Sequence, residues 1–177
     1  MKRLMALVLS LVMLAAFGAA YAGGDIETTP EEEKVTAFGI PTKEDLADLK
    51  ADADAQWDEE DYSGAAEDYA ELAEKAGWLY EIVAAVNAPL AGGEAADSAI
   101  AERVGKAESL AGEYFEIYKL ALIRAGMGYY YAEDYEEALP YLLQALEKID
   151  AADTENWILC AEAVMVIIGE TEAPEAE

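Results

Sequence analysis

The sequence predicts an all-α protein. Alanine, glutamate and leucine dominate it, whereas alternating runs of β-branched residues and Asn-Gly turns, the usual signals of strands and hairpins, are missing. In residues 135–149, apolar side chains recur every three or four positions, as they do on one face of a helix. The chain is also 54% hydrophobic despite a net charge of −27, which favours a folded protein with an acidic surface over a disordered chain.

The first 22 residues have the pattern of a secretory signal peptide. Lys2 and Arg3 precede an apolar run over residues 4–17, and a small-x-small motif follows and ends at Ala22. We expect cleavage after Ala22, and export to the periplasm or cell envelope or secretion from the cell. The alternative is a retained membrane anchor. The shortness of the apolar run and the cleavage motif disfavour it, so we expect no stable membrane span in the mature protein.

Three segments are expected after the cleavage site. Residues 23–41 are rich in glycine, proline, threonine and glutamate and are predicted to be a flexible acidic leader. Thr42 is suited to cap a helix whose first turn carries acidic residues, so a helical domain is expected over residues 42–168. Residues 169–177 are too polar to pack and are predicted to be a disordered acidic tail.

Within this domain the apolar periodicity and the glycines suggest a series of short helices separated by turns. The expected helical segments are 62–76, 78–87, 95–110, 113–131, 135–149 and 154–168, with a loop at residues 89–93.

An internal repeat connects two of these segments. The dipeptide Asp61-Tyr62 returns as Asp134-Tyr135, 73 residues later (134 − 61), which is room for about two helical hairpins. In residues 119–150, small and aromatic residues then fall at the spacing of a known motif, at Gly126, Tyr129, Tyr135, Ala138 and Ala145. On these residues the chain resembles the tetratricopeptide repeat (TPR) family, with Asp134-Tyr135 in the position of that family's turn between helices.

The resemblance implies a TPR-like solenoid of about three degenerate hairpins, over residues 43–76, 78–110 and 119–150, closed by a C-terminal helix. Its small residues would let helices approach closely and its tyrosines would fill the space between hairpins. The residues expected to pack the repeats are Tyr62, Ala65, Gly126, Tyr129, Tyr135, Ala138 and Ala145. A helical bundle of another kind is the alternative fold.

Composition disfavours most catalytic and cofactor chemistry. The chain has no histidine, so neither a Ser-His-Asp triad nor a His-ligated zinc site is available, and its negative charge repels nucleic acid. Residues 52–63 resemble a calcium loop, but Trp57 stands where that loop needs glycine. Cys160 is the only cysteine and lies in an apolar run, as a small buried residue would. We expect no enzyme activity, cofactor or metal.

Two groups of residues are candidates for partner binding. Tyrosine concentrates in residues 114–141, and a tyrosine side chain offers an apolar body with a polar tip. The helix expected near the C-terminus is apolar on all sides, so it needs a cover from this chain or from another one. The candidate binding residues are Tyr118, Tyr130, Tyr131, Trp157, Val166 and Ile167.

These observations favour an exported, non-catalytic scaffold that binds a protein or peptide, with basic partners preferred because of the acidic surface. One alternative is a self-associating structural protein, a homo-oligomer joined through residues 154–168. Another is a small carboxylate hydrolase, although only Glu162 lies in an apolar stretch that would alter its acidity. A salt-rich habitat is a second explanation for the acidity, independent of any partner.

Overall fold

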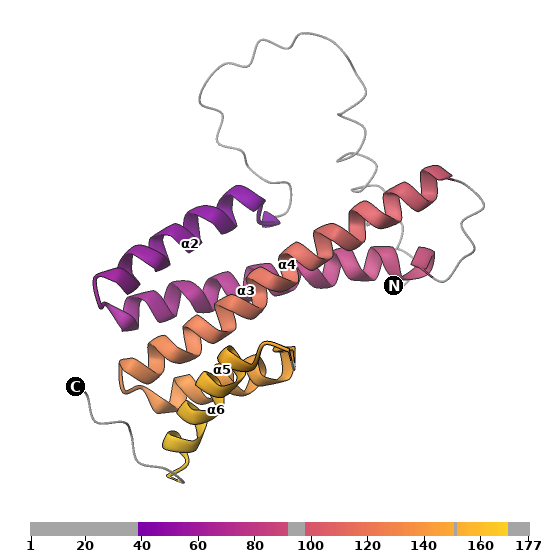
Figure 1. Ribbon diagram of the computed structural model, residues 1–177. Helices are drawn as coiled ribbons and strands as arrows, with labels where there is room; N and C mark the ends of the chain where they lie inside the picture. Colours follow the sequence, from indigo (N-terminus) through magenta and orange to yellow (C-terminus); the bar gives the residue numbers. More distant parts are fainter. Residues whose placement is uncertain (1–38, 92–97, 151, 170–177) are drawn as a thin grey trace, which may run out of the picture. The chain divides into compact units, whose positions relative to one another are not determined.

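The computed structural model describes residues 39–91, 98–150 and 152–169, all within the unit Thr36–Glu177. These residues form five helices and no strand (Figure 1), which confirms the all-α prediction. The helices are α2 (Lys43–Asp58), α3 (Tyr62–Ala91), α4 (Ser98–Tyr131), α5 (Tyr135–Lys148) and α6 (Thr154–Ile167). The predicted signal peptide, almost all of the leader and the tail from residue 170 onward lie outside the described residues.

Helix α2 begins where the sequence predicts. Thr42 is its N-cap, and the Thr42 hydroxyl accepts a hydrogen bond from the Asp45 backbone N–H at 3.1 Å. The Asp45 carboxylate accepts one in return from the Thr42 backbone N–H at 2.6 Å. This reciprocal pair satisfies two of the backbone donors that a helix leaves free at its start.

Helices α3 and α4 are longer than expected, with 30 and 34 residues. The predicted breaks near residues 77 and 111 are wrong, because Gly77 and Gly112 both lie inside helices. At Gly77 the glycine is a packing residue: an added Cβ would lie only 3.1 Å from the Tyr118 ring. The predicted loop at residues 89–93 also begins too early, since Pro89 is still helical.

Residues 78–110 therefore do not form a separate hairpin between the two predicted repeats. They continue α3 and α4, which run side by side (Figure 1). Their close contacts show an antiparallel arrangement, because Gly128 of α4 meets Ala66 near the start of α3 and Tyr118 meets Gly77 farther along it. Helix α2 packs on α3, α5 packs on α4, and α6 packs on α5 and α4. The solenoid arrangement stays a prediction.

Small residues let these helices approach closely, and a few large side chains fill the core between them. Gly126 shows how close the approach is, because a Cβ there would lie 2.8 Å from the Leu142 side chain and 3.0 Å from the Leu142 nitrogen. The largest fully buried side chains are Tyr69, Leu72, Leu122, Leu142 and Cys160. Close backbone approach of this kind is what glycine and alanine permit at helix contacts.

The repeated Asp-Tyr dipeptide marks two turns of the same geometry. Glu60 and Glu133 adopt left-handed backbone conformations, with φ values of 63° and 62°. Matching backbone hydrogen bonds close both turns: Asp61 and Asp134 donate to the carbonyls of Gln56 and Tyr129 at 2.9 Å, and Glu60 and Glu133 donate to those of Trp57 and Tyr130 at 3.1 Å. This is the Schellman pattern of a helix end.

Each turn also starts the following helix. Asp61 accepts a hydrogen bond from the Gly64 backbone N–H at 3.1 Å, and Asp134 accepts one from the Glu137 N–H at 3.4 Å. Every corresponding residue in the two turns is 73 positions apart, so the sequence repeat is also a repeat of local structure at these two points.

Candidate binding site

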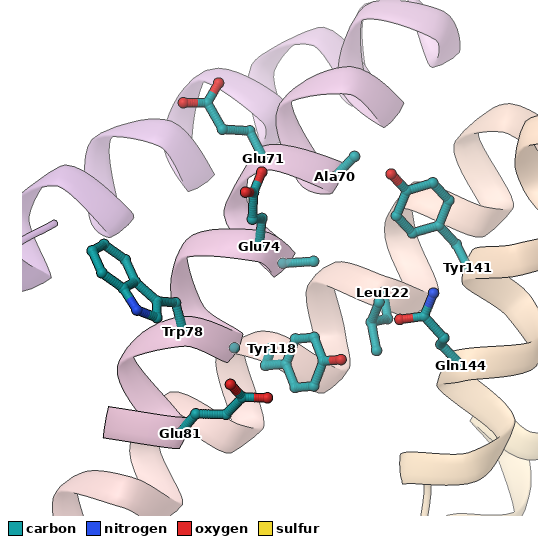
Figure 2. Close-up of a pocket in the computed structure, with 11 residues that line it drawn as sticks. Ala70, Glu71, Glu74, Trp78, Glu81, Tyr118, Leu122, Tyr141 and Gln144 are labelled. Atoms are coloured by element: carbon teal, nitrogen blue, oxygen red, sulfur yellow. The ribbon is translucent and has the colours of Figure 1, made fainter. Parts of the chain in front are cut away.

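Three helices border an open groove of about 890 Å³. In Figure 2, Tyr118 and Leu122 of α4 lie between residues of α3 on one side and Tyr141 and Gln144 of α5 on the other. We call this the α3–α5 groove. Its lining residues are Ala70, Glu71, Ala73, Glu74, Gly77, Trp78, Glu81, Tyr118, Leu122, Tyr141 and Gln144.

Small residues on α3 make room for the groove. Ala70, Ala73 and Gly77 are spaced by three and four positions, so they share one face of the helix. Gly77 admits the Tyr118 ring from α4, because even a methyl group at this position would crowd it. The sequence thus places small side chains on α3 next to the Tyr118 ring of α4.

The α3 wall of the groove carries a regular stripe of side chains. Glu71, Glu74, Trp78 and Glu81 follow one another at spacings of three, four and three residues, so they also lie along a single helix face. All four are exposed, and Trp78 retains 43% of its surface accessible to solvent. An exposed tryptophan between two glutamates is a surface that combines apolar area with negative charge.

The groove is electronegative. Lys75 pairs with Glu71 at 2.6 Å, but no lysine or arginine within the described ranges forms an ion pair with Glu74 or Glu81. On the opposite wall, partial burial raises the pKa of Tyr141, and the nearby carboxylates of Glu137 and Glu74 raise it further. The negative field of Glu74 therefore reaches the tyrosine that faces it across the groove.

Of the six residues predicted to bind a partner, only Tyr118 lines this groove. Tyr130 and Tyr131 lie at the α4–α5 turn, where Tyr131 is 47% exposed and its ring centre is 5.2 Å from that of Tyr62. Trp157 is exposed on α6, Val166 is half-buried, and Ile167 packs against the core. The structure does not bring the six residues together.

Sequence reasoning missed Trp78, Tyr141 and the pair Glu74 and Glu81. The α3 stripe was visible as a 3-4-3 spacing, but the expected helix end near residue 77 divided it between two segments. The position of Tyr141 opposite this stripe had no signal in the sequence, because it depends on how α5 packs against α4.

The residues predicted to pack the repeats occupy contacts between helices in most cases. Ala65, Ala138 and Ala145 are fully buried, and Gly126 contacts Leu142. The Tyr62 ring meets Trp57 edge-on, with ring centres 5.3 Å apart, and Tyr129 stacks on Tyr141 at 5.7 Å. Tyr135 is 41% exposed and lies beside Tyr130, with ring centres 5.8 Å apart.

Comparisons were made with protein-family models, with curated proteins and with solved structures. None of the three found a match to this chain.

Other candidate chemistry can be placed on the described residues. Burial, together with a smaller effect of the negative charge of Asp153, raises the pKa of the Cys160 thiol to about 11. Glu162, the carboxylate in the apolar stretch of α6, is exposed. Among the described residues no group of three or more acidic or cysteine side chains could hold a metal ion. No helix in the described ranges is long and apolar enough to cross a membrane.

Proposed function

We propose that this protein is an exported, non-catalytic binding module that holds a segment of a protein partner in the α3–α5 groove. One observation carries the proposal. Three aromatic side chains, Trp78, Tyr118 and Tyr141, line the same open groove as two glutamates, Glu74 and Glu81, that form no ion pair with the described residues.

The composition of the groove favours a peptide segment as its occupant. The aromatic rings offer large apolar area at a small entropic cost, which is why tryptophan and tyrosine are enriched at binding hot spots. Glu74 and Glu81 attract positive charge and repel acidic segments, so they contribute selectivity and speed of encounter. A groove of about 890 Å³ falls within the range of protein ligand sites, roughly 300–1,000 Å³.

Export and a TPR-like organisation are parts of the same proposal. The pattern of residues 1–22 supports export through a cleaved signal peptide. The matching turns at residues 59–61 and 132–134 support a duplicated hairpin unit, because helix end, turn and helix start are built alike in both.

Site-specific photo-crosslinking tests this function. A photo-crosslinking amino acid replaces Gln144, which lines the groove, or Leu143, which is 46% exposed and is not a lining residue. In envelope extract of the source cells, position 144 should give a defined adduct that is absent at position 143. The partner identified from the adduct should bind the purified mature protein, and Tyr118→Ala should weaken that binding roughly ten-fold.

Tyr118→Phe and the melting temperature of each variant serve as controls for folding, because Tyr118 also contacts Gly77. Adducts of equal yield at positions 143 and 144 would remove the groove from consideration as the binding site.

A second function is favoured by the surface of α6. Cys160 and Ala163 face the core, but four large apolar side chains on the same helix are exposed, namely Trp157, Ile158, Leu159 and Met165, and so is Ile168 at its C-cap. Self-association through this face would bury them. Light scattering at micromolar concentration should then show a dimer that Ile158→Lys dissociates, and a strict monomer would reject this function.

A further inference from the structure

We propose that the occupant of the α3–α5 groove is an α-helix that carries two basic residues seven positions apart with an apolar residue between them. This inference rests on the proposed function and names the class of partner. It follows from the register of the α3 stripe, from the helices that flank the groove and from the charges of the chain's own segments.

Three exposed side chains of α3 set the spacing that a bound helix must match. Trp78 lies four residues after Glu74 and three before Glu81, so the two carboxylates are seven residues, or about two helical turns, apart. At a rise of about 1.5 Å per residue this is a separation of roughly 10.5 Å along α3. A helix packed lengthwise against α3 presents side chains at the same interval, because packed helices match each other in repeats of seven.

The groove has the walls that a docked helix needs. Helix α4 packs against both α3 and α5, so its half-buried residue Tyr118, beside the almost fully buried Leu122, forms the base of the groove between two flanking helices (Figure 2). An amphipathic helix in such a groove buries its apolar face against the base and the aromatic residues of the walls. Its basic residues, at the margin of that face, then reach Glu74 and Glu81.

Charge argues against the chain's own ends as the occupant. Residues 23–38 carry five acidic residues and one lysine, and residues 170–177 carry four glutamates and no cation. Lys2 and Arg3 of the predicted signal peptide are adjacent, so they cannot meet carboxylates seven residues apart.

A second copy of the chain is also disfavoured. Lys43 and Lys50 of α2 do have a spacing of seven, but they already form ion pairs with Glu113 and Asp54, each at 2.5 Å. Leu46 between them is buried in the core. The net charge of −27 further opposes contact between copies. These observations leave a separate, cationic helix as the occupant.

Designed peptides test the register. Two helical peptides of identical composition carry lysines either seven or five positions apart, with leucine between them, and their binding to the mature protein is measured by fluorescence anisotropy. We expect the seven-spaced peptide to bind roughly two- to five-fold more tightly, because a spacing of five turns one lysine away from α3 and removes one exposed ion pair. High salt should weaken its binding.

Glutamine substitutions locate the contacts. Glu74→Gln and Glu81→Gln should each weaken binding of the seven-spaced peptide roughly two- to five-fold, as expected for exposed ion pairs. Glu108→Gln, at an exposed position of α4 outside the groove, is the matched control and should leave the affinity unchanged. Glu81→Lys should abolish the tighter binding of the seven-spaced peptide relative to the five-spaced one. A seven-spaced peptide with glutamate in place of the lysine that faces position 81 should restore the tighter binding to this variant.

Three results would overturn the inference: equal binding of the two peptides, no binding of either, or a Glu108→Gln effect as large as that of Glu81→Gln. A second copy as the occupant, seen as a dimer that Tyr118→Ala dissociates and that Ile158→Lys leaves intact, would overturn it as well. These outcomes leave the proposed function intact if position 144 still gives a crosslinked partner. If position 144 gives no adduct, the proposed function of partner binding in the groove is itself rejected.

Discussion

At the scale of single residues, Glu60 and Glu133 occupy the least favourable backbone positions among the described residues. Their φ values of 63° and 62° lie in the left-handed region, which glycine tolerates and which costs other residues roughly 1–2 kcal/mol. Both turns are nevertheless formed, because each helix end is closed by two backbone hydrogen bonds and an aspartate caps the helix that follows.

We therefore predict that Glu133→Gly stabilises the protein by about 0.5–1 kcal/mol, since it removes the left-handed strain at the cost of some entropy in the unfolded chain. Glu67→Gly is the matched control at an exposed position inside α3, and it should destabilise the protein by about 1 kcal/mol. Urea denaturation measures both changes. A loss of stability in Glu133→Gly equal to that in Glu67→Gly would contradict the role of this turn.

We predict that the titration of Cys160 makes the free energy of unfolding depend on pH. Burial raises the pKa of its thiol from 9.0 to about 11 in the folded chain. A pKa raised by folding contributes stability that is complete below pH 9 and is lost as the pH rises toward 11, because only the unfolded chain then ionises readily. By pH 11 the loss should be about 2 kcal/mol for this group.

Urea denaturation at pH 8 and pH 11 measures this loss, and Cys160→Ala is the comparison. The variant should be less stable at pH 8 because it leaves a small cavity, but it should lose less stability on going to pH 11. The native thiol should also react slowly with iodoacetamide at pH 8, because the thiolate is the nucleophile. Equal pH dependence in both proteins would show that Cys160 does not titrate as inferred.

At the scale of elements, α4 contains glycines with opposite roles. Gly126 lies where α5 packs, with space for no side chain, whereas Gly112 of the same helix has nothing within 4 Å of an added Cβ. A glycine inside a helix weakens it, so the cost is compensated only where close packing requires the missing side chain.

The same substitution should consequently have opposite effects in α4. Gly126→Ala should lower the free energy of unfolding by about 1–3 kcal/mol, because the new methyl group forces Leu142 to move. Gly112→Ala should raise it by about 0.5–1 kcal/mol through helix propensity alone. Thermal or urea unfolding of the two variants provides the measurement. Destabilisation of similar size at both positions would refute the packing role given to Gly126.

The elements also show where sequence reasoning succeeded and where it failed. Thr42, Asp61 and Asp134 were recognisable as helix boundaries, because capping chemistry is local. Gly77 was mistaken for a boundary because nothing nearby in the chain reveals Tyr118, the residue that it contacts. Because of that error the groove was not predicted, since the glutamates and Trp78 that line its α3 wall span residues 71–81 and were divided between two expected helices.

At the scale of the whole molecule, the excess of negative charge is the dominant feature. The chain has 38 acidic residues against 11 basic ones. Five lysines of the described residues already form ion pairs, and the side chains in these pairs are mostly exposed to solvent. Exposed pairs stabilise a fold only slightly, so they do not offset the mutual repulsion of the remaining carboxylates.

We predict that this repulsion makes stability depend on salt. The melting temperature should rise by roughly 3–5 °C between 20 mM and 500 mM NaCl, because salt screens repulsion between exposed charges. Exposed Asp52 and Glu108 provide the control, since the double substitution Asp52→Lys and Glu108→Lys should reduce the salt effect. Differential scanning calorimetry measures the melting temperature of both proteins at each NaCl concentration. A melting temperature that is unchanged or falls with NaCl would show that the acidity does not destabilise this fold.

Features of this protein that depend on local chemistry could be predicted from the sequence. It predicted the all-helical class, the capped start of α2, and the duplicated Asp-Tyr turn, because capping groups, periodicity and turn residues act within a few positions of each other. Tertiary structure alone decided the lengths of α3 and α4 and the position of Tyr141 opposite Glu74 across the groove. These features depend on contacts between residues far apart in the chain, where the close approach permitted by Gly77 and Gly126 fixes which side chains meet.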